Sequence, residues 1–144
     1  MSLSSLRIHM DACKISGELY EIVKGWPYFD RDTLGKQLIR AADSISHNIA
    51  EGYGRAATGE RLQFMFYADG SIQEAKNQIQ LASDRLLISE HDAIELRRRL
   101  MRLSISLIEF AAAIAERDKS YKGRYIGIID QRRAWLLKQY AEKR

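Results

Sequence analysis

The amino-acid sequence predicts an all-α protein, an antiparallel up-down-up-down four-helix bundle with a basic C-terminal extension. Apolar residues recur at intervals of three and four along four long segments, which is the spacing of an amphipathic helix. The connections between these segments are short, and short connections make neighbouring helices antiparallel. One proline and nine glycines in 144 residues leave little room for long irregular segments.

The first predicted helix runs from about Leu6 to Lys24 and ends before Pro27, because proline lacks an amide donor. It carries two neighbouring apolar stripes: Leu6, Met10, Cys13, Gly17 and Tyr20 on one, and Ile15, Leu19 and Ile22 on the other. The second predicted helix spans about residues 32–53, and Asp30 or Asp32 is expected to cap its start. Gly52 and Gly54 are expected to end it in the left-handed conformation.

The third predicted helix spans about residues 59–87, with Thr58 as its cap. Its core stripe consists of Leu62, Met65, Ile72, Ala75, Ile79, Ala82 and Leu86. The fourth opens at Ser89, and Asp92 lies three residues on, as in a capping box. Its stripe alternates between steps of three and four without a break, as in a coiled coil: Ala93, Leu96, Leu100, Leu103, Leu107, Phe110 and Ile114.

The chain divides by charge into a bundle, residues 1–118, and an extension, residues 119–144. The bundle holds 15 Lys and Arg against 17 Asp and Glu, whereas the extension holds 8 against 2. Gly123 and Gly127 suggest an irregular or extended start of the extension, followed by a short helix from about Asp130. The extension is too apolar for a disordered arm. We expect it to pack on the bundle or on a neighbouring subunit, and we favour the neighbour.

No residue pattern predicts a catalytic or metal site. The sequence contains no hydrolase, kinase or nucleotide-binding motif. His9, His47 and His91 lie on three different segments, and none has a second His or Cys at metal-ligand spacing. The Glu-x-x-His pairs of di-iron bundles do not occur either. We therefore expect a protein that is not an enzyme and uses no cofactor and no metal.

Cysteine usage and hydropathy favour the cytoplasm. Cys13 is the single cysteine, which rules out an intramolecular disulfide and fits a reducing compartment. Its place on the first helix predicts a small buried hydrophobe. The longest apolar run, residues 110–115, is too short to span a bilayer, and the N-terminus lacks the pattern of a signal peptide. We expect a cytoplasmic protein with no membrane contact.

Four positions on the second and third predicted helices form an unusual polar and small-residue motif: Asn48, Glu51 and Gly52 near the end of the second, and Ser71 on the third. Asn48 and Ser71 lie at the edge of the apolar faces, and Glu51 and Glu74 lie further out. The structural interpretation is that they link the second helix to the third by hydrogen bonds and fix their register. Ligand binding is the alternative.

The third predicted helix has a second seam, roughly opposite its core stripe: Gln63, Tyr67, Gly70, Glu74, Asn77 and Leu81. Gly70 costs a helix interior about 1 kcal/mol relative to alanine, so a close approach by another helix would explain it. We interpret this seam as a subunit interface, with Tyr125 and Trp135 of the extension as further contacts. A solvent-exposed face with an incidental glycine is the alternative.

Basic residues gather on two helices. The fourth predicted helix carries Arg97, Arg98, Arg99 and Arg102, and the second carries Lys36 and Arg40. Repeated in a ring, such patches would form a phosphate-binding surface. The predicted phosphate contacts are Lys36, Arg40, Arg97, Arg98 and Arg102. The alternative is a solvated face with pairs such as Glu95 to Arg99.

Two stretches, QLIRAADSISHNIAEGYGR at 37–55 and FMFYADGSIQEAKNQIQLA at 64–82, carry a family resemblance. The sequence resembles the bacterial four-helix-bundle proteins related to the 23S ribosomal RNA intervening-sequence proteins, over about residues 3–118. Members include accessory proteins of diversity-generating retroelements, which form ring-like homo-oligomers and bind nucleic acid alongside a reverse transcriptase. The resemblance implies a four-helix bundle, a homo-oligomeric and pentameric ring, and RNA, DNA or a reverse transcriptase or other protein as partners.

Two functions from different classes follow. The first is a non-enzymatic accessory protein that contacts the backbone of RNA or DNA, since no base-reading module is visible. The second is an oligomeric scaffold or protein-interaction module with no role in nucleic-acid binding.

Overall fold

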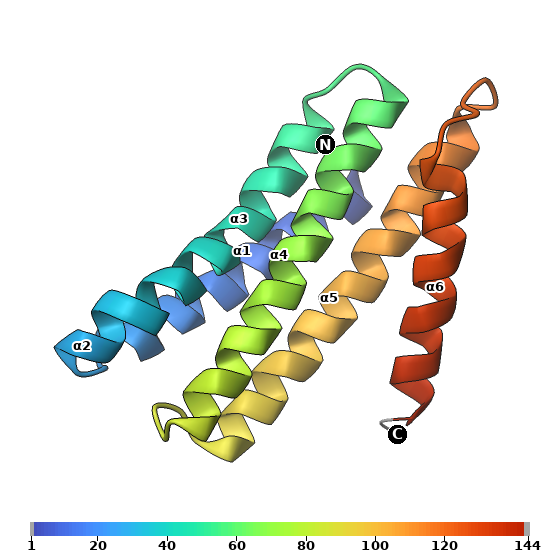
Figure 1. The fold of residues 1–144 in the computed structure, drawn as a ribbon. Coiled ribbons are helices and arrows are strands. Elements are labelled where there is room, and N and C mark those ends of the chain that lie inside the picture. Colours follow the sequence, from blue (N-terminus) through green and yellow to red (C-terminus); the bar gives the residue numbers. More distant parts are fainter. Residues whose placement is uncertain (1, 143–144) are drawn as a thin grey trace.

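The computed structural model describes residues 2–142, and every regular element in that range is helical (Figure 1). The helices are α1 (Leu3–Lys24), α2 (Tyr28–Asp30), α3 (Lys36–Tyr53), α4 (Thr58–Asp84), α5 (Glu90–Arg117) and α6 (Tyr125–Glu142). A π-helical turn, Arg31–Gly35, joins α2 to α3. The prediction of an all-α protein is therefore confirmed.

Four long helices share one hydrophobic core. Both α3 and α5 pack against α1 and against α4. As a result α3 and α5 occupy diagonal positions, and so do α1 and α4. Large side chains from all four helices are completely buried at the centre, among them Leu19, Ile49, Leu62, Ile72, Leu100 and Leu107.

The predicted helix boundaries hold at some ends and fail at others. Ser89 caps α5 as expected, because its Oγ accepts a hydrogen bond from the amide of Asp92 at 3.1 Å. Neither Asp30 nor Asp32 caps a helix by its side chain. The helical path instead begins directly after Pro27, which is preorganised for a helix start. Thr58 does not cap α4 either; its hydroxyl donates to Asp118 at 2.7 Å.

Of the two apolar stripes expected on α1, one faces solvent. Met10 is 60% exposed and Tyr20 is 52% exposed, and Leu6, Cys13 and Gly17 are exposed as well. The side that holds Ile15 and Leu19 of the other predicted stripe enters the core, and its buried residues are Ile8, Ala12, Ile15, Leu19 and Val23. The helix carries two apolar stripes and can bury only one of them, and the stripe with more branched aliphatic side chains is the buried one.

Gly52 serves packing rather than helix termination. No described glycine has a positive φ, and Gly54, at the end of α3, has φ −76° and ψ −9°. The expected left-handed exit is therefore wrong. A Cβ on Gly52 would lie 2.5 Å from Cε of Met65 and 2.8 Å from Cβ of Phe64. Glycine at this position thus allows α3 and α4 to approach each other closely.

The C-terminal extension forms α6, which starts at Tyr125 rather than near Asp130. Figure 1 shows α6 lying beside α5. Tyr125, Ile129 and Leu136 join the core of their own chain. The expected irregular start is confined to the residues before Tyr125, since Gly127 lies inside the helix.

Candidate nucleic-acid interface

The four arginines of α5 point in different directions. Arg98 and Arg102 are exposed and form no hydrogen bond or ion pair with any described residue. Arg97 is half-buried, and its Nη1 donates to Oε1 of Gln80 on α4 at 2.9 Å. Arg99 forms an ion pair with Glu18 of α1. Arg97 is therefore engaged within the chain, against our expectation, and Arg99 pairs with α1 rather than with Glu95.

A lysine from α1 joins the free arginines. Lys14 and Arg102 line the same hollow of about 230 Å³ between α1 and α5, together with Asp11 and Ser106. Lys14 is exposed and has no hydrogen-bond or ion-pair partner among the described residues. Sequence reasoning missed it, because an isolated lysine on another helix gives no local signal.

Lys36 and Arg40 belong to a separate surface. They lie on α3, which is diagonal to α5, so the structure does not bring all five predicted phosphate contacts together within one chain. Nζ of Lys36 lies 2.6 Å from Oδ1 of Asp32. Arg40 is exposed and has no such partner in the described part of the chain.

Two polar residues of the predicted motif, Asn48 and Ser71, are linked through Ser44 by hydrogen bonds between α3 and α4. Nδ2 of Asn48 donates to the carbonyl oxygen of Ser44 at 2.8 Å and to its Oγ at 2.9 Å. Oγ of Ser44 lies 2.8 Å from Oγ of Ser71, which also donates to the carbonyl oxygen of Tyr67. Glu51 takes no part; it is exposed and pairs with Arg55 at 2.5 Å.

The outer seam of α4, which we define as Gln63, Tyr67, Gly70 and Glu74, lies away from the core. Tyr67 is 51% exposed, and its Oη accepts a hydrogen bond from Nε2 of Gln63 at 2.8 Å. A Cβ on Gly70 would meet nothing within 4 Å. No helix of the same chain therefore accounts for this glycine.

The two interface residues predicted in the extension differ. Tyr125 is 9% exposed, and its ring stacks on that of Phe66 with the centroids 5.3 Å apart. It is used inside the chain, so we remove it from the predicted interface. Trp135 is 43% exposed, with the guanidinium of Arg132 over its ring at 4.5 Å.

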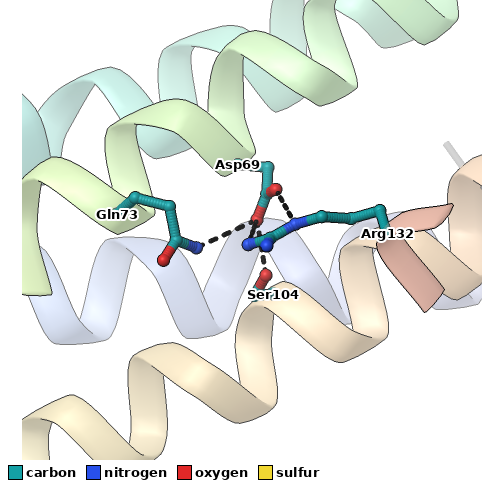
Figure 2. Close-up of polar contacts among 4 residues, drawn as sticks. All are labelled: Asp69, Gln73, Ser104 and Arg132. Atoms are coloured by element: carbon teal, nitrogen blue, oxygen red, sulfur yellow. Dashed lines mark hydrogen bonds and ion pairs between the residues drawn. The ribbon is translucent and has the colours of Figure 1, made fainter. Parts of the chain in front are cut away.

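A buried carboxylate holds α6 in place (Figure 2). Asp69 of α4 is 5% exposed and accepts hydrogen bonds from Ser104 of α5 and from Arg132 of α6, whose Nε lies 2.6 Å from Oδ2. Gln73 donates to the same carboxylate at 3.4 Å. Side chains from α4, α5 and α6 thus meet at the Asp69 carboxylate. The Asp69 carboxylate is satisfied by donors from three side chains, and burial with such partners favours a structural role.

The remaining candidate groups are the metal-ligating side chains, Cys13 and Asp118. Among the described residues, no three His, Cys, Asp or Glu gather in a way that could hold a metal ion. Cys13 is exposed rather than buried, with Nδ1 of His9 3.8 Å from its sulfur. Hydrogen bonds from Ser120 and Thr58 lower the pKa of the Asp118 carboxyl. This carboxylate joins the start of α4 to the loop after α5.

No helix in the described range has the length and apolar character needed to cross a membrane.

Comparison with known protein families identifies a match over most of the chain. A family model described as 23S rRNA-intervening sequence protein matches residues 4–109, which is most of the chain and covers α1 to most of α5. No curated protein matches the chain. The match agrees with the resemblance carried by residues 37–55 and 64–82. The chain belongs to the 23S rRNA-intervening sequence protein family.

Proposed function

We propose that this protein is a non-enzymatic, homo-oligomeric accessory protein that binds the phosphate backbone of RNA or DNA. The observation that carries the proposal is the pair Arg98 and Arg102, both exposed and both without a partner among residues 2–142. Lys14, which has no partner in that range either, lines the same hollow as Arg102. Family membership supports a connection with ribosomal RNA insertions.

Cations without internal partners are the ones that contribute most to phosphate binding. A cation that already has a carboxylate partner must give it up before it gains a phosphate, whereas a free one releases counterions from the nucleic acid. We therefore assign the principal contacts to Arg98, Arg102 and Lys14, with Lys36 and Arg40 on a second surface. Such contacts position a protein on nucleic acid without reading its sequence.

We further propose an antiparallel up-down-up-down bundle, residues 1–118, that assembles into a closed ring, with five subunits as the number that family resemblance implies. Two unpartnered faces support assembly: the outer seam of α4 and the exposed stripe of α1, formed by Leu6, Met10, Cys13, Gly17 and Tyr20. They lie on diagonal helices, and a head-to-tail ring needs two different surfaces on each subunit. The proposed location is the cytoplasm, and a reverse transcriptase or another protein is a proposed partner.

The test is fluorescence-anisotropy binding of the purified protein to structured RNA and to duplex DNA across a salt series. We expect affinity to fall steeply with salt, and the double change Arg98→Ala and Arg102→Ala to reduce the slope of log K against log salt by about 2. Lys122→Ala is the matched control, since Lys122 is an exposed cation in the loop after α5. Equal effects of the control and the double change would contradict the proposed site.

An oligomeric scaffold is the second candidate. The exposed apolar side chains of α1 and α4, Leu6, Met10, Tyr20 and Tyr67, favour it, since apolar surface suits contacts between proteins better than contacts with phosphate. Gly70→Leu tests the interface that both candidates share, because a larger side chain would hold an approaching helix away. We expect native mass spectrometry to show smaller species for this variant. An unchanged mass would remove the outer seam of α4 from the interface.

A further inference from the structure

The corner between α1 and α3 presents two aromatic rings to solvent. Tyr28 is 71% exposed and Phe29 is 74% exposed, although both follow directly on Pro27 in a helical turn. The same corner is firmly attached to the core. Trp26 is 6% exposed, and a Cβ on Gly35 would lie 2.7 Å from Cγ1 of Val23. The two rings are thus displayed on a well-anchored segment rather than on a loose loop.

Cations lie around the Tyr28 ring. A groove of about 390 Å³ is lined by Tyr20 and Tyr28 together with Lys24, Arg31, Lys36 and Arg40, and Asp32 is the single carboxylate in its lining. The guanidinium of Arg31 lies 5.8 Å from the centroid of the Tyr28 ring. Arg40 has no hydrogen-bond or ion-pair partner among the described residues. The groove therefore combines aromatic faces with an excess of positive charge.

We propose that this aromatic corner, defined by Tyr20, Tyr28, Phe29, Arg31, Lys36 and Arg40, binds single-stranded nucleic acid. Unpaired bases stack on Tyr28 and Phe29, while Arg40, Arg31 and Lys36 contact the phosphates between them. Aromatic faces beside cations are the usual construction of sites that bind single strands without reading their sequence. A duplex cannot use the rings in the same way, because its bases already stack on one another.

This inference rests on the proposed function in one respect, namely that the protein contacts nucleic acid. It concerns a different surface, however, since the corner lies on α1 to α3 and the principal cations Arg98 and Arg102 lie on α5. It adds a preference that the arginines of α5 do not predict: the corner distinguishes single strands from duplexes.

The test compares labelled oligouridine and oligothymidine of about 20 nucleotides with a duplex DNA of the same length, using the full-length protein. We expect Tyr28→Ala and Phe29→Ala each to weaken single-strand binding about tenfold and to leave duplex binding unchanged. Arg40→Ala should reduce the salt slope for single strands by about 1, whereas the aromatic changes should leave that slope unaltered. Comparing the two single strands shows whether RNA or DNA is preferred.

Two controls make the result decisive. Tyr53→Ala removes an exposed tyrosine at the far end of α3 and should change neither affinity. Tyr28→Trp keeps a stacking face and should retain single-strand binding, which excludes a general effect on folding. The inference is overturned if the wild-type protein does not bind single strands, or if the aromatic changes affect duplex and single strand equally or not at all. Failure of the proposed function would give a different result: duplex binding would not change on Arg98→Ala and Arg102→Ala.

Discussion

The contact of α3 with α4 and the contact of α1 with α5 both join two long helices of one core, yet they are built differently. Between α3 and α4 the backbones approach so closely that Gly52 has no room for a methyl group, and Ser44 meets Ser71 at 2.8 Å. Along α1 and α5, hollows of about 590, 230 and 420 Å³ lie between the helices. Charged side chains line those hollows, among them Lys14 and Arg102.

The two contacts differ in the role of their residues: those of the α3–α4 contact stabilise the fold, whereas the α1–α5 contact includes cations that are available for binding. The two stretches that carry the family resemblance, residues 37–55 and 64–82, are the two sides of the close α3–α4 contact. Their unusual residues are used for packing. Lys14, Arg98 and Arg102, which have no partner among the described residues, lie outside both stretches. Apart from Arg40, the residues that reveal the family are therefore not the ones to which we assign binding.

The largest expected effect is on the free energy of unfolding when one methyl group is added to each contact. Gly52→Ala should lower the free energy of unfolding by about 2 kcal/mol, because its Cβ would lie 2.8 Å from Cβ of Phe64 and 3.2 Å from the carbonyl oxygen of Arg61. Gly17→Ala on α1 should instead raise it by about 0.5 to 1 kcal/mol, since nothing lies within 4 Å and alanine is the better helix former. Urea denaturation measures both. Equal signs for the two changes would contradict the difference between the contacts.

Removing cations should affect nucleic-acid binding more at the α1–α5 contact than at the α3–α4 contact. Lys14→Ala combined with Arg102→Ala, in the α1–α5 hollow, should weaken binding to duplex DNA roughly tenfold at low salt and reduce the salt slope by about 2. Arg55→Ala, at the end of the α3–α4 contact, removes a cation that already pairs with Glu51. It should change affinity less than twofold, or roughly 0.4 kcal/mol. An anisotropy titration in which all variants behave alike would show that binding depends on net charge alone.

Single hydroxyl groups give a smaller contrast. Ser71→Ala removes the hydroxyl that meets Ser44 across the α3–α4 contact, and it should cost about 1 kcal/mol of unfolding free energy. Ser106→Ala, at the α1–α5 hollow, removes an exposed hydroxyl without a partner in the described chain and should be neutral. Thermal unfolding of both variants distinguishes the two contacts. A larger loss for Ser106→Ala than for Ser71→Ala would contradict this interpretation.

The sequence predicted the all-α class and most of the core stripes of the third and fourth helices, because those helices have one apolar face each and little choice of which face to bury. Leu86 is the exception: it is 91% exposed and follows the end of α4 at Asp84, where the prediction continued the helix. The two apolar stripes of α1 left open which of them enters the core. Sequence reasoning also missed the ion pair of Asp69 with Arg132, since residues 63 positions apart give no local signal of contact. The grouping of the predicted phosphate contacts into two surfaces, and the engagement of Arg97 by Gln80, follow only from how the helices are placed.

The smallest expected effect concerns a third contact, where Asp118 after α5 accepts a hydrogen bond from Thr58 at the start of α4. Hydrogen bonds from Ser120 and from Thr58 lower the pKa of Asp118 from its ordinary value of 3.8. A carboxyl whose pKa is lower in the folded state stabilises the fold above its unfolded pKa, and this stabilisation is lost as pH falls through the folded pKa. Asp118→Asn should therefore lower Tm slightly at neutral pH and flatten the fall of Tm below the ordinary pKa.

Asp11→Asn is the control, because it changes a carboxylate of the α1–α5 hollow that accepts no hydrogen bond from the described residues. It should leave the pH dependence of Tm as in the wild type. The contrary result is that Asp11→Asn flattens the fall of Tm at low pH as much as Asp118→Asn does. A carboxylate in the α1–α5 hollow would then stabilise the fold as much as the hydrogen-bonded Asp118, which would contradict the difference between the contacts.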